Sequence, residues 1–355
     1  MKDYSQRFLS ETVRLSKGCG ASAGTLWTNL ALPNGSAITN VFNGAGMLAG
    51  TYLKNSGGSI LNKHVYTYNS AGQRSQQTRA DSSYIDYTYD ADGQLESGWT
   101  YTSGGSPITS ETFGFNYDGG WNMTQRTNNA AATTYTVNDR NQVTGDGVNT
   151  FSYDTHGNRY HKIWYSPSTG SITYTYDDEQ RLSSAYTDTY YTPSGSRWKV
   201  EFTYDGKSRL RIRKRYTWDS YQGDWSTSPS ETRFIYDGML MMQERNGANT
   251  PTVSYTRGLD LSGSLEGAGG IGGLLARSSS YSGGSWSTHL YYHADAGGNV
   301  TYLANDWQRL RMAPCSRQTV PESLPGVAGP PTRQTRDVRG LCTSPRRSSR
   351  RKRRG

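Results

Sequence analysis

The side chains most able to bind a metal gather near residue 290, in the stretch THLYYHADAGG. His289 and His293 are four residues apart, a spacing that brings two imidazoles together as metal ligands on a helix. The stretch alternates like a strand, however, and alternate residues of a strand point to the same face. A two-histidine ligand pair near Asp295 is therefore one interpretation, but we predict no metal site and no catalytic role here.

A glycine-rich stretch, GAGGIG, has the spacing of a dinucleotide-binding fingerprint at Gly267, Gly269 and Gly272. That fingerprint binds a cofactor where a strand runs into a helix within a βαβ unit. No such alternation surrounds these glycines, so we interpret the stretch as a flexible or bulged connection between repeats. His156 and His161, in a predicted turn and the strand after it, are expected to be exposed to solvent. The sequence thus predicts no catalytic, cofactor-binding or metal-binding residues, and a protein that is not an enzyme.

Cysteines and carboxylates add no further site. Cys19, Cys315 and Cys342 are too widely spaced for a disulfide framework or a zinc site. Many carboxylates recur at one position of a repeated unit, where an Asp side chain bonds nearby backbone N–H groups and opens a turn. Calcium-binding solenoids also use turn aspartates, but in short Gly-Asp-rich repeats of another period. We therefore predict an architectural role for Asp90, Asp154, Asp177 and Asp205.

The repeated unit is clearest in FSYDTHGNRY, residues 151–160. It reads aromatic, any residue, aromatic, Asp or Asn, two residues, then Gly or a small polar residue. Successive copies stand roughly 20 to 30 residues apart, a period typical of repeat architectures. Copies begin at Tyr66, Tyr87, Phe115, Phe151, Tyr174, Phe202 and Phe234, with more degenerate ones at Phe42 and Tyr135 and a last one in YYHADAGGNVTYL.

Each copy has the properties of a β-hairpin. Two rings two residues apart lie on one face of a strand. The Asp or Asn opens a turn, the Gly tolerates a left-handed backbone, and a second strand follows, often with an apolar residue such as Leu95 or Leu182 near its start. One hairpin is marginal in water, whereas stacked hairpins bury a continuous ladder of rings. We therefore predict an all-β array of hairpins.

Composition agrees with this fold. The 355 residues include 27 Tyr and 41 Gly, which suits many short strands joined by tight turns and argues against helical bundles. No run of about 18 apolar residues occurs, so no membrane span is expected. The first residues, MKDYSQRFLSETVRLS, lack an apolar stretch after a charged start, so no secretory signal is expected.

The basic character of the chain belongs to its last part. Residues 1–305 carry 25 Lys and Arg against 26 Asp and Glu, whereas residues 306–355 carry 13 against 3. Together these give the net charge of +9, so no basic face on the body is predicted. The end SPRRSSRRKRRG is expected to bind nucleic acid only weakly, because it has clustered arginines but no aromatic residues for stacking.

The repeat pattern resembles the YD-repeat family, which comprises bacterial Rhs proteins, the C components of insecticidal toxin complexes and a part of animal teneurins. The resemblance covers about residues 40–303 and rests on repeated Tyr-Asp with Gly at a fixed offset. It is strengthened by YTRGLDLSGSLEGAGGIGGLLARSSS, residues 255–280, and by YYHADAGGNVTYLAND, which look like a run near the end of the Rhs repeat region. The resemblance implies a β-sheet wound into a hollow shell that encloses a C-terminal toxin in bacterial members.

The chain departs from the family after residue 303. Relatives continue into further Tyr-Asp units and a closing core, whereas here an Arg-, Pro- and Ser-rich sequence follows, with no Tyr or Phe after Tyr302. A frameshift or premature end is one hypothesis, and an ordinary disordered segment is the other. We expect a degenerate or partial repeat region at 1–40, the repeat array at 41–303 and a disordered basic tail at 304–355.

The resemblance favours a structural function. The chain is expected to be a segment of an Rhs-type shell that encloses or delivers a toxin between bacteria, outside the cell or at its surface. Its expected partners are toxin cargo or further YD-repeat segments, and no cofactor. The alternative is an extracellular module that stacks rings on cell-surface sugars, with candidate rings at Trp99, Trp121, Trp164, Trp198 and Trp218. A shell hides its rings inside a curved sheet, whereas a sugar-binding module leaves a row of them on an open face.

Overall fold

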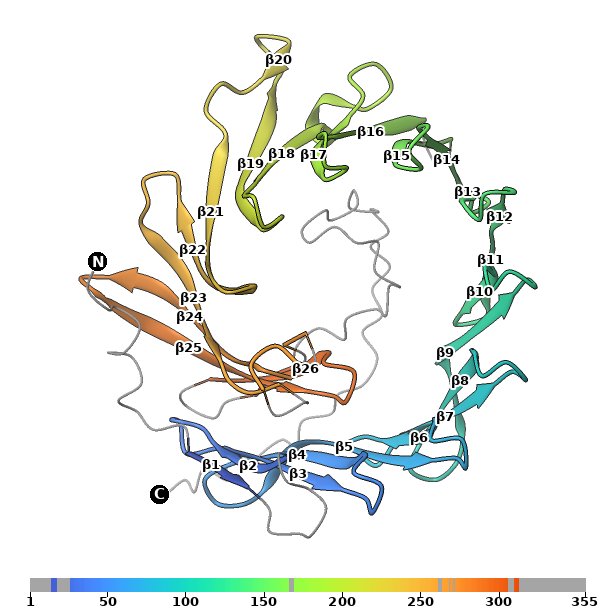
Figure 1. The fold of residues 1–355 in the computed structure, drawn as a ribbon, viewed down its shortest axis with the longest axis vertical. Coiled ribbons are helices and arrows are strands. Elements are labelled where there is room, and N and C mark those ends of the chain that lie inside the picture. Colours follow the sequence, from blue (N-terminus) through green and yellow to red (C-terminus); the bar gives the residue numbers. More distant parts are fainter. Residues whose placement is uncertain are drawn as a thin grey trace, which may run out of the picture. The chain divides into compact units, whose positions relative to one another are not determined.

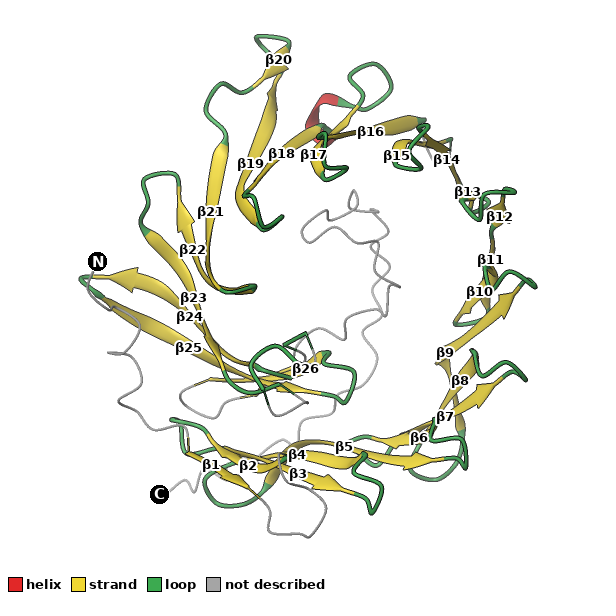
Figure 2. Ribbon diagram, in the orientation of Figure 1, coloured by secondary structure: helices red, strands yellow, loops and turns green. Residues whose placement is uncertain are grey.

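The computed structural model describes residues 14–17, 26–165, 169–260, 264–267, 269–270, 272–305 and 310–312, with side chains described only between residues 26 and 305. All of these residues belong to one compact unit, Met1–Arg317. The described chain is strand and turn apart from one short 3₁₀ helix, η1 (Ser194–Ser196) (Figure 2). The predicted all-β class is confirmed. No helix in these ranges is long and apolar enough to cross a membrane.

The strands form two antiparallel meanders, in which strands that follow one another in sequence pair side by side (Figure 1). Only β20 (Asp224–Trp225), among the described strands, lies off this path and pairs with β19 alone. The first sheet contains β1 (Arg14–Lys17), β2 (Trp27–Ala31), β3 (Ala37–Phe42), β4 (Leu48–Lys54), β5 (Ile60–Tyr68), β6 (Arg74–Thr78), β7 (Tyr84–Tyr89), β8 (Leu95–Tyr101), β9 (Pro107–Tyr117), β10 (Met123–Asn128) and β11 (Ala131–Thr134).

The second sheet begins directly after the first and contains the remaining described strands. They are β12 (Thr136–Val137), β13 (Val143–Gly145), β14 (Asn149–Tyr153), β15 (Arg159–Trp164), β16 (Gly170–Tyr176), β17 (Leu182–Thr187), β18 (Trp198–Tyr204), β19 (Leu210–Asp219), β20, β21 (Ser230–Asp237), β22 (Leu240–Asn246), β23 (Pro251–Arg257), β24 (Leu274–Ser282), β25 (Ser285–Ala294), β26 (Val300–Asn305) and β27 (Leu310–Met312). Pairing between neighbours in sequence needs only short turns, as the hairpin unit predicts.

Strands extend beyond the predicted array at both ends. β1, β2 and most of β3 lie within residues 1–40, and β27 lies within the predicted tail. The rest of that tail, residues 306–309 and 313–355, lies outside the described residues.

The turns of the repeat are built alike. After β7, the Asp90 N–H donates to the Gln94 carbonyl at 3.0 Å, and the Gly93 N–H donates to the Asp90 carbonyl at 3.1 Å. The Asp90 carboxylate accepts the N–H groups of Asp92 and Gln94 at 3.0 and 2.8 Å. Gly93 has a φ of +84°, the left-handed conformation that closes a three-residue hairpin loop with a bulge. This geometry accounts for both the Asp and the Gly of the unit.

The left-handed position of the turn is not always occupied by Gly. Gln180 and Ser208 adopt it with φ values of 62° and 57°. Trp121 does so as well, with a φ of 65°, and its side chain is 67% exposed. A positive φ strains a bulky residue, so Trp121 stands at this position at an energetic cost.

The second aromatic residue of the unit ties its hairpin to an earlier one. The Tyr176 hydroxyl donates to the Arg159 carbonyl at 2.9 Å, and the Tyr204 hydroxyl donates to the Leu182 carbonyl at 3.0 Å. In each case the acceptor is the first residue of the strand that follows an earlier turn. This explains why the position takes Tyr rather than Phe. The same bond joins Tyr68 to Leu48, Tyr89 to Arg74, Tyr117 to Leu95 and Tyr153 to Val143.

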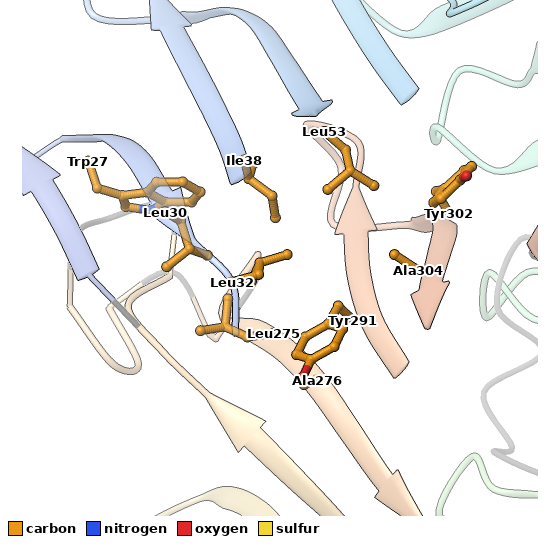
Figure 3. Packing of buried hydrophobic residues seen from close by; sticks show 10 residues of the cluster. All are labelled: Trp27, Leu30, Leu32, Ile38, Leu53, Leu275, Ala276, Tyr291, Tyr302 and Ala304. Atoms are coloured by element: carbon orange, nitrogen blue, oxygen red, sulfur yellow. The ribbon is translucent and has the colours of Figure 1, made fainter. Parts of the chain in front are cut away.

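The apolar core lies where the first strands pack against the last ones. Leu30 in β2, Leu53 in β4 and Ala304 in β26 are each 1% exposed. Figure 3 shows side chains from both ends of the array facing one another. A core built this way cannot form within one repeat, so it joins the ends of the array. The cluster comprises Trp27, Leu30, Leu32, Ile38, Leu53, Leu275, Ala276, Tyr291, Tyr302 and Ala304.

Candidate functional site

A polar cluster also joins the first and last strands. It consists of Thr51 in β4, Asn62 and His64 in β5, His293 in β25 and Thr301 in β26, and we call it the seam. His293 is 1% exposed and His64 is 5% exposed. Their rings are stacked with centroids 5.8 Å apart. The seam therefore places two imidazoles from opposite ends of the array in one buried contact.

The hydrogen bonds of His293 fix its protonation. Asn62 Nδ2 donates to His293 Nδ1 at 3.0 Å, so this ring nitrogen is an acceptor. His293 Nε2–H then donates to the Thr51 hydroxyl at 3.0 Å. Asn62 also donates to the Thr301 hydroxyl at 3.0 Å, which ties β5 to β26. A second proton on His293 would face the amide N–H of Asn62, so the network fits only the neutral ring.

The network of His64 has the same form. Gln77 Nε2, in β6, donates to His64 Nδ1 at 2.9 Å, and the Tyr87 hydroxyl donates to Gln77 Oε1 at 2.9 Å. His64 Nε2–H donates to the Thr301 hydroxyl at 2.8 Å. Protonation of Nδ1 would again set one N–H donor against another, which leaves a buried donor without an acceptor.

Burial keeps both imidazoles neutral. Desolvation, with a smaller contribution from the neighbouring His64, lowers the pKa of His293 to about 3. Desolvation also lowers the pKa of His64 to about 4, with Asp295 opposing the shift and Arg79 adding to it. The seam is therefore a neutral hydrogen-bonded contact near pH 7 that acid would charge.

A second contact fixes the turn of the last repeat copy to the first sheet. The Ala296 N–H donates to the Tyr66 hydroxyl at 2.8 Å, and Arg74 donates to the Ala296 carbonyl at 2.8 Å. The Arg74 guanidinium also lies 5.1 Å from the centroid of the Tyr66 ring. Tyr66 is 4% exposed, and desolvation raises its pKa. The first ring of a repeat unit thus also holds the far end of the array.

The two histidines that the sequence offered as one interpretation of a ligand pair, His289 and His293, have separate roles. His293 is part of the seam, whereas His289 Nδ1 bonds the Ser278 hydroxyl at 2.8 Å. In the described part of the chain, no group of three or more His, Cys, Asp or Glu side chains could hold a metal.

The glycine-rich stretch leads into a strand. Gly269 and Gly272 have φ values of 64° and 80°, and the Gly267 N–H donates to the Ser264 hydroxyl at 2.7 Å. Among the described residues of this stretch, the element that follows is the strand β24 rather than a helix whose N-terminus could bind a dinucleotide phosphate.

The other histidines, His156 and His161, lie outside the seam. His156 is exposed in the turn after β14, and its N–H donates to Asp154 at 2.9 Å. His161 is half-buried in β15 and stacks on Tyr160 with centroids 6.2 Å apart. The cysteines lie outside the described residues, at positions Cys19, Cys315 and Cys342.

The turn aspartates bond the backbone as predicted. Backbone N–H groups donate to the carboxylates of Asp90, Asp154, Asp177 and Asp205. The Arg209 side chain, bonded to Asp205 at 2.9 Å, holds the pKa of that carboxyl well below its usual range. The backbone N–H of Arg181 is the main cause of the lowered pKa of Asp177. These carboxylates serve as acceptors in the turns.

The five predicted tryptophans fall into two groups. Trp99 is 46% exposed and Trp121 is 67% exposed, whereas Trp164, Trp198 and Trp218 are half-buried. The most exposed rings of the described chain stand in loops and turns, as at Tyr190 and Tyr221, which are 85% and 93% exposed. The rings therefore do not separate cleanly into a hidden set and an open set.

Sequence reasoning named His293 but missed the other seam residues. The available signal was weak: Asn62 and His64 are polar residues at alternate positions of a strand whose next alternate residues, Tyr66 and Tyr68, are rings of the repeat. Polar side chains on an otherwise aromatic face point to a partner that supplies hydrogen bonds. The partner, more than 200 positions away, could not be named.

Comparison with known proteins finds no matching family model. Among curated proteins, the chain is 26% identical over 193 residues to the tRNA nuclease WapA of Bacillus subtilis and to the tRNA3(Ser)-specific nuclease WapA of Bacillus spizizenii. In both cases the match covers 54% of this chain and 6% of the relative. The chain thus spans a small part of the curated proteins that it resembles.

Similar solved structures contain TccC3. They include the Photorhabdus luminescens Tc holotoxin pore, at 14% identity and a TM-score of 0.42, and TcdB2-TccC3, at 14% identity and a TM-score of 0.40. The matches cover 83% and 80% of this chain and 17% of each solved chain. The comparisons confirm the resemblance to Rhs and toxin-complex proteins.

Proposed function

We propose that the chain is a segment of a YD-repeat shell of an Rhs-type toxin, which encloses or delivers a toxin in competition between bacteria. The observation that carries this proposal is the joining of the ends of the array through the apolar core and the seam. Six of the repeats also bond an earlier strand through a Tyr hydroxyl. Such a continuous wall, with its ends joined, suits a protein that separates a cargo from its surroundings.

The proposal assigns no catalysis to this segment. His289, His293 and the turn aspartates bond strands, the seam or turns, which accounts for their presence without a reaction. The partners are toxin cargo and further YD-repeat segments, and the place of action is outside the cell or at its surface.

Protease protection tests this role. We would fuse a short unfolded reporter with one site for a sequence-specific protease to the C-terminus, and compare its cleavage rate with that of the same reporter as a free peptide. The control is the reporter fused to an unrelated globular protein. Cleavage at least tenfold slower than in the control supports a shell segment, whereas equal rates contradict it.

Binding of cell-surface sugars is a second candidate, favoured by Trp121. This ring is 67% exposed and stands at a strained left-handed position where Gly would cost less. Exposed rings stack well on the apolar faces of sugars. A glycan array with the wild type and Trp121→Gly tests this function: loss of a bound glycan in the variant supports it, and absence of binding by the wild type contradicts it.

A further inference from the structure

The strand register divides the side chains of the second sheet into two chemically different faces. Residues directly opposite one another on paired strands share a face. Phe202 pairs with Arg213, which pairs with Thr232, and Phe234 pairs with Glu244. We call the face of β18–β24 that bears these residues the aromatic face. By the same rule it bears Val253, Tyr255, Arg277, Arg257, Arg211 and Arg215.

The aromatic face has a strong excess of positive charge. Arg211, Arg213 and Arg215 alternate along β19, and Arg257 and Arg277 lie on β23 and β24. Among the paired positions of the described strands β18–β24, the aromatic face bears one carboxylate, that of Glu244. It accepts a hydrogen bond from the Tyr255 hydroxyl at 2.7 Å. The near-zero net charge of residues 1–305, which by itself implies no basic face, therefore conceals one.

Four of these arginines have no carboxylate partner. Among the described residues, Arg211 forms an ion pair with Asp205. The arginines without an ion pair within 4.0 Å are Arg213, Arg215, Arg257 and Arg277. Arg277 Nε is buried without a hydrogen-bond partner. Arg257 Nε donates to the Met241 carbonyl at 3.1 Å, and desolvation lowers the pKa of this arginine, which has no carboxylate within ion-pair distance among the described residues. An anion bound on this face would supply what these groups lack.

The opposite face of the same strands has a smaller share of its cations without an ion pair, because two of its four, Lys199 and Arg233, are paired with carboxylates. Lys199 pairs with Glu201 at 2.8 Å, and Arg233 pairs with Glu231 at 2.6 Å. Lys214 lies directly opposite Glu201 on the neighbouring strand. The excess of unpaired cations is therefore larger on the aromatic face, whereas Lys214 and Arg245 are the cations of the opposite face outside these ion pairs.

The rings of the aromatic face do not suit nucleic acid. Phe234 is buried, and the Arg213 guanidinium lies 5.6 Å from its centroid. Arg181 and Arg209 lie 5.1 and 5.4 Å from the rings of Tyr204 and Tyr236. Single-stranded nucleic acid binds best where basic groups are combined with open rings on which bases can stack, whereas carboxylates need only the guanidinium forks.

We propose that the aromatic face of β18–β24 binds acidic polypeptide segments of the cargo through Arg213, Arg215, Arg257 and Arg277. This inference rests on the proposed function, because it names the chemistry of the cargo that the shell would accept. Guanidinium groups bind carboxylates with paired hydrogen bonds, and the adjoining rings exclude water from them.

Binding of a fluorescent 20-residue poly-glutamate peptide to the full chain, followed by anisotropy, tests the inference. The four arginines are changed to Gln in one variant, and Lys199, Lys214, Arg233 and Arg245 of the opposite face are changed to Gln in a matched control. Both variants lose four charges and keep the basic C-terminal residues, so those residues contribute equally. We expect the aromatic-face variant to bind at least tenfold more weakly and the control to stay within threefold of wild type.

A photo-crosslinker separates the two faces without removing charge. Thr232 is on the aromatic face and its neighbour Glu231 is on the other. A benzophenone side chain at position 232 of the otherwise unchanged protein should crosslink the peptide, and one at 231 should not. This arm keeps the test decisive if the fourfold variant fails to fold.

Several results would overturn the inference. The first two are equal weakening of poly-glutamate binding in both variants and equal crosslinking at both positions. The third is that a 20-nucleotide oligo-dT binds the wild type more tightly than poly-glutamate does and that the aromatic-face variant loses this binding, which would make nucleic acid the partner. Protection of the fused reporter without binding of poly-glutamate would overturn this inference and leave the proposed function standing. Binding of poly-glutamate without protection would instead contradict the proposed function.

Discussion

Acid is expected to open the contact between the first and last strands, because His64 and His293 are buried there as neutral rings. Each accepts an amide N–H at Nδ1, so a proton at that atom removes a hydrogen bond and charges a buried group. With both rings protonated, two cations would lie with centroids 5.8 Å apart. Acidification therefore destabilises the seam in three ways: it charges buried imidazoles, it removes the hydrogen bonds at their Nδ1 atoms, and it makes the two rings repel one another.

The size of the effect follows from the pKa values. An unfolded histidine has a pKa of about 6.5, whereas the folded values are about 4 for His64 and about 3 for His293. The unfolded chain thus binds more protons at acidic pH, and stability falls as the pH drops from 6.5 towards these folded values. At pH 4.5 the two groups together remove about 5 kcal/mol of the free energy of unfolding.

Urea unfolding followed by tryptophan fluorescence at pH 7.5, 6.5, 5.5 and 4.5 measures this loss. The test variant is His64→Gln with His293→Gln, because Gln offers a donor and an acceptor but does not titrate. His156→Gln, in an exposed turn, is the control. The turn aspartates Asp177 and Asp205, whose pKa values are lowered, lose their contribution only below about pH 4.

We expect the wild type and the control to lose about 5 kcal/mol more than the double variant between pH 7.5 and 4.5. If the double variant loses as much as the wild type, the acid sensitivity arises elsewhere and the buried-histidine explanation is refuted.

The repeat geometry gives three further predictions, all measurable by urea unfolding at pH 7.5. Tyr176→Phe removes the hydrogen bond to the Arg159 carbonyl and should lower the free energy of unfolding by about 1 kcal/mol. Tyr160→Phe, an exposed control, should lower it much less. Equal losses in the two variants would contradict a role of the Tyr176 hydroxyl in joining repeats. Gly157→Ala, at a φ of +89°, should cost about 1 to 2 kcal/mol, and a neutral result would show that the turn does not need this conformation. Trp121→Gly should raise the free energy of unfolding by about 1 kcal/mol, and a loss would mean that the ring stabilises the fold.

Sequence predicted the parts of the fold that depend on near neighbours. In the unit at Tyr87–Gly93, every residue that determines the hairpin is local: alternating rings, a turn-forming Asp and a left-handed Gly lie within seven residues. Pairing of consecutive strands follows from the short turns. The role of the Asp and the all-β class could therefore be derived before the structure was known.

The parts that depend on distant residues could not be derived. His293 bonds Asn62 and Thr51, which lie more than 200 positions earlier in the sequence, and no local residue spacing predicts such a contact. The basic face could not be predicted for a related reason. The charges of Arg213 and Glu231 cancel in the net charge of the chain, and only the strand register shows that the two side chains lie on opposite faces of the sheet.

The cleavage rate of the C-terminal reporter, relative to the same reporter on an unrelated globular protein, tests the shell function most directly. A wall whose ends are joined through His64, His293 and the apolar core should shield the reporter, so we predict cleavage at least tenfold slower at pH 7.5. Cleavage at the rate of the control, with the array shown to be folded by its urea transition, would contradict a role in enclosing cargo.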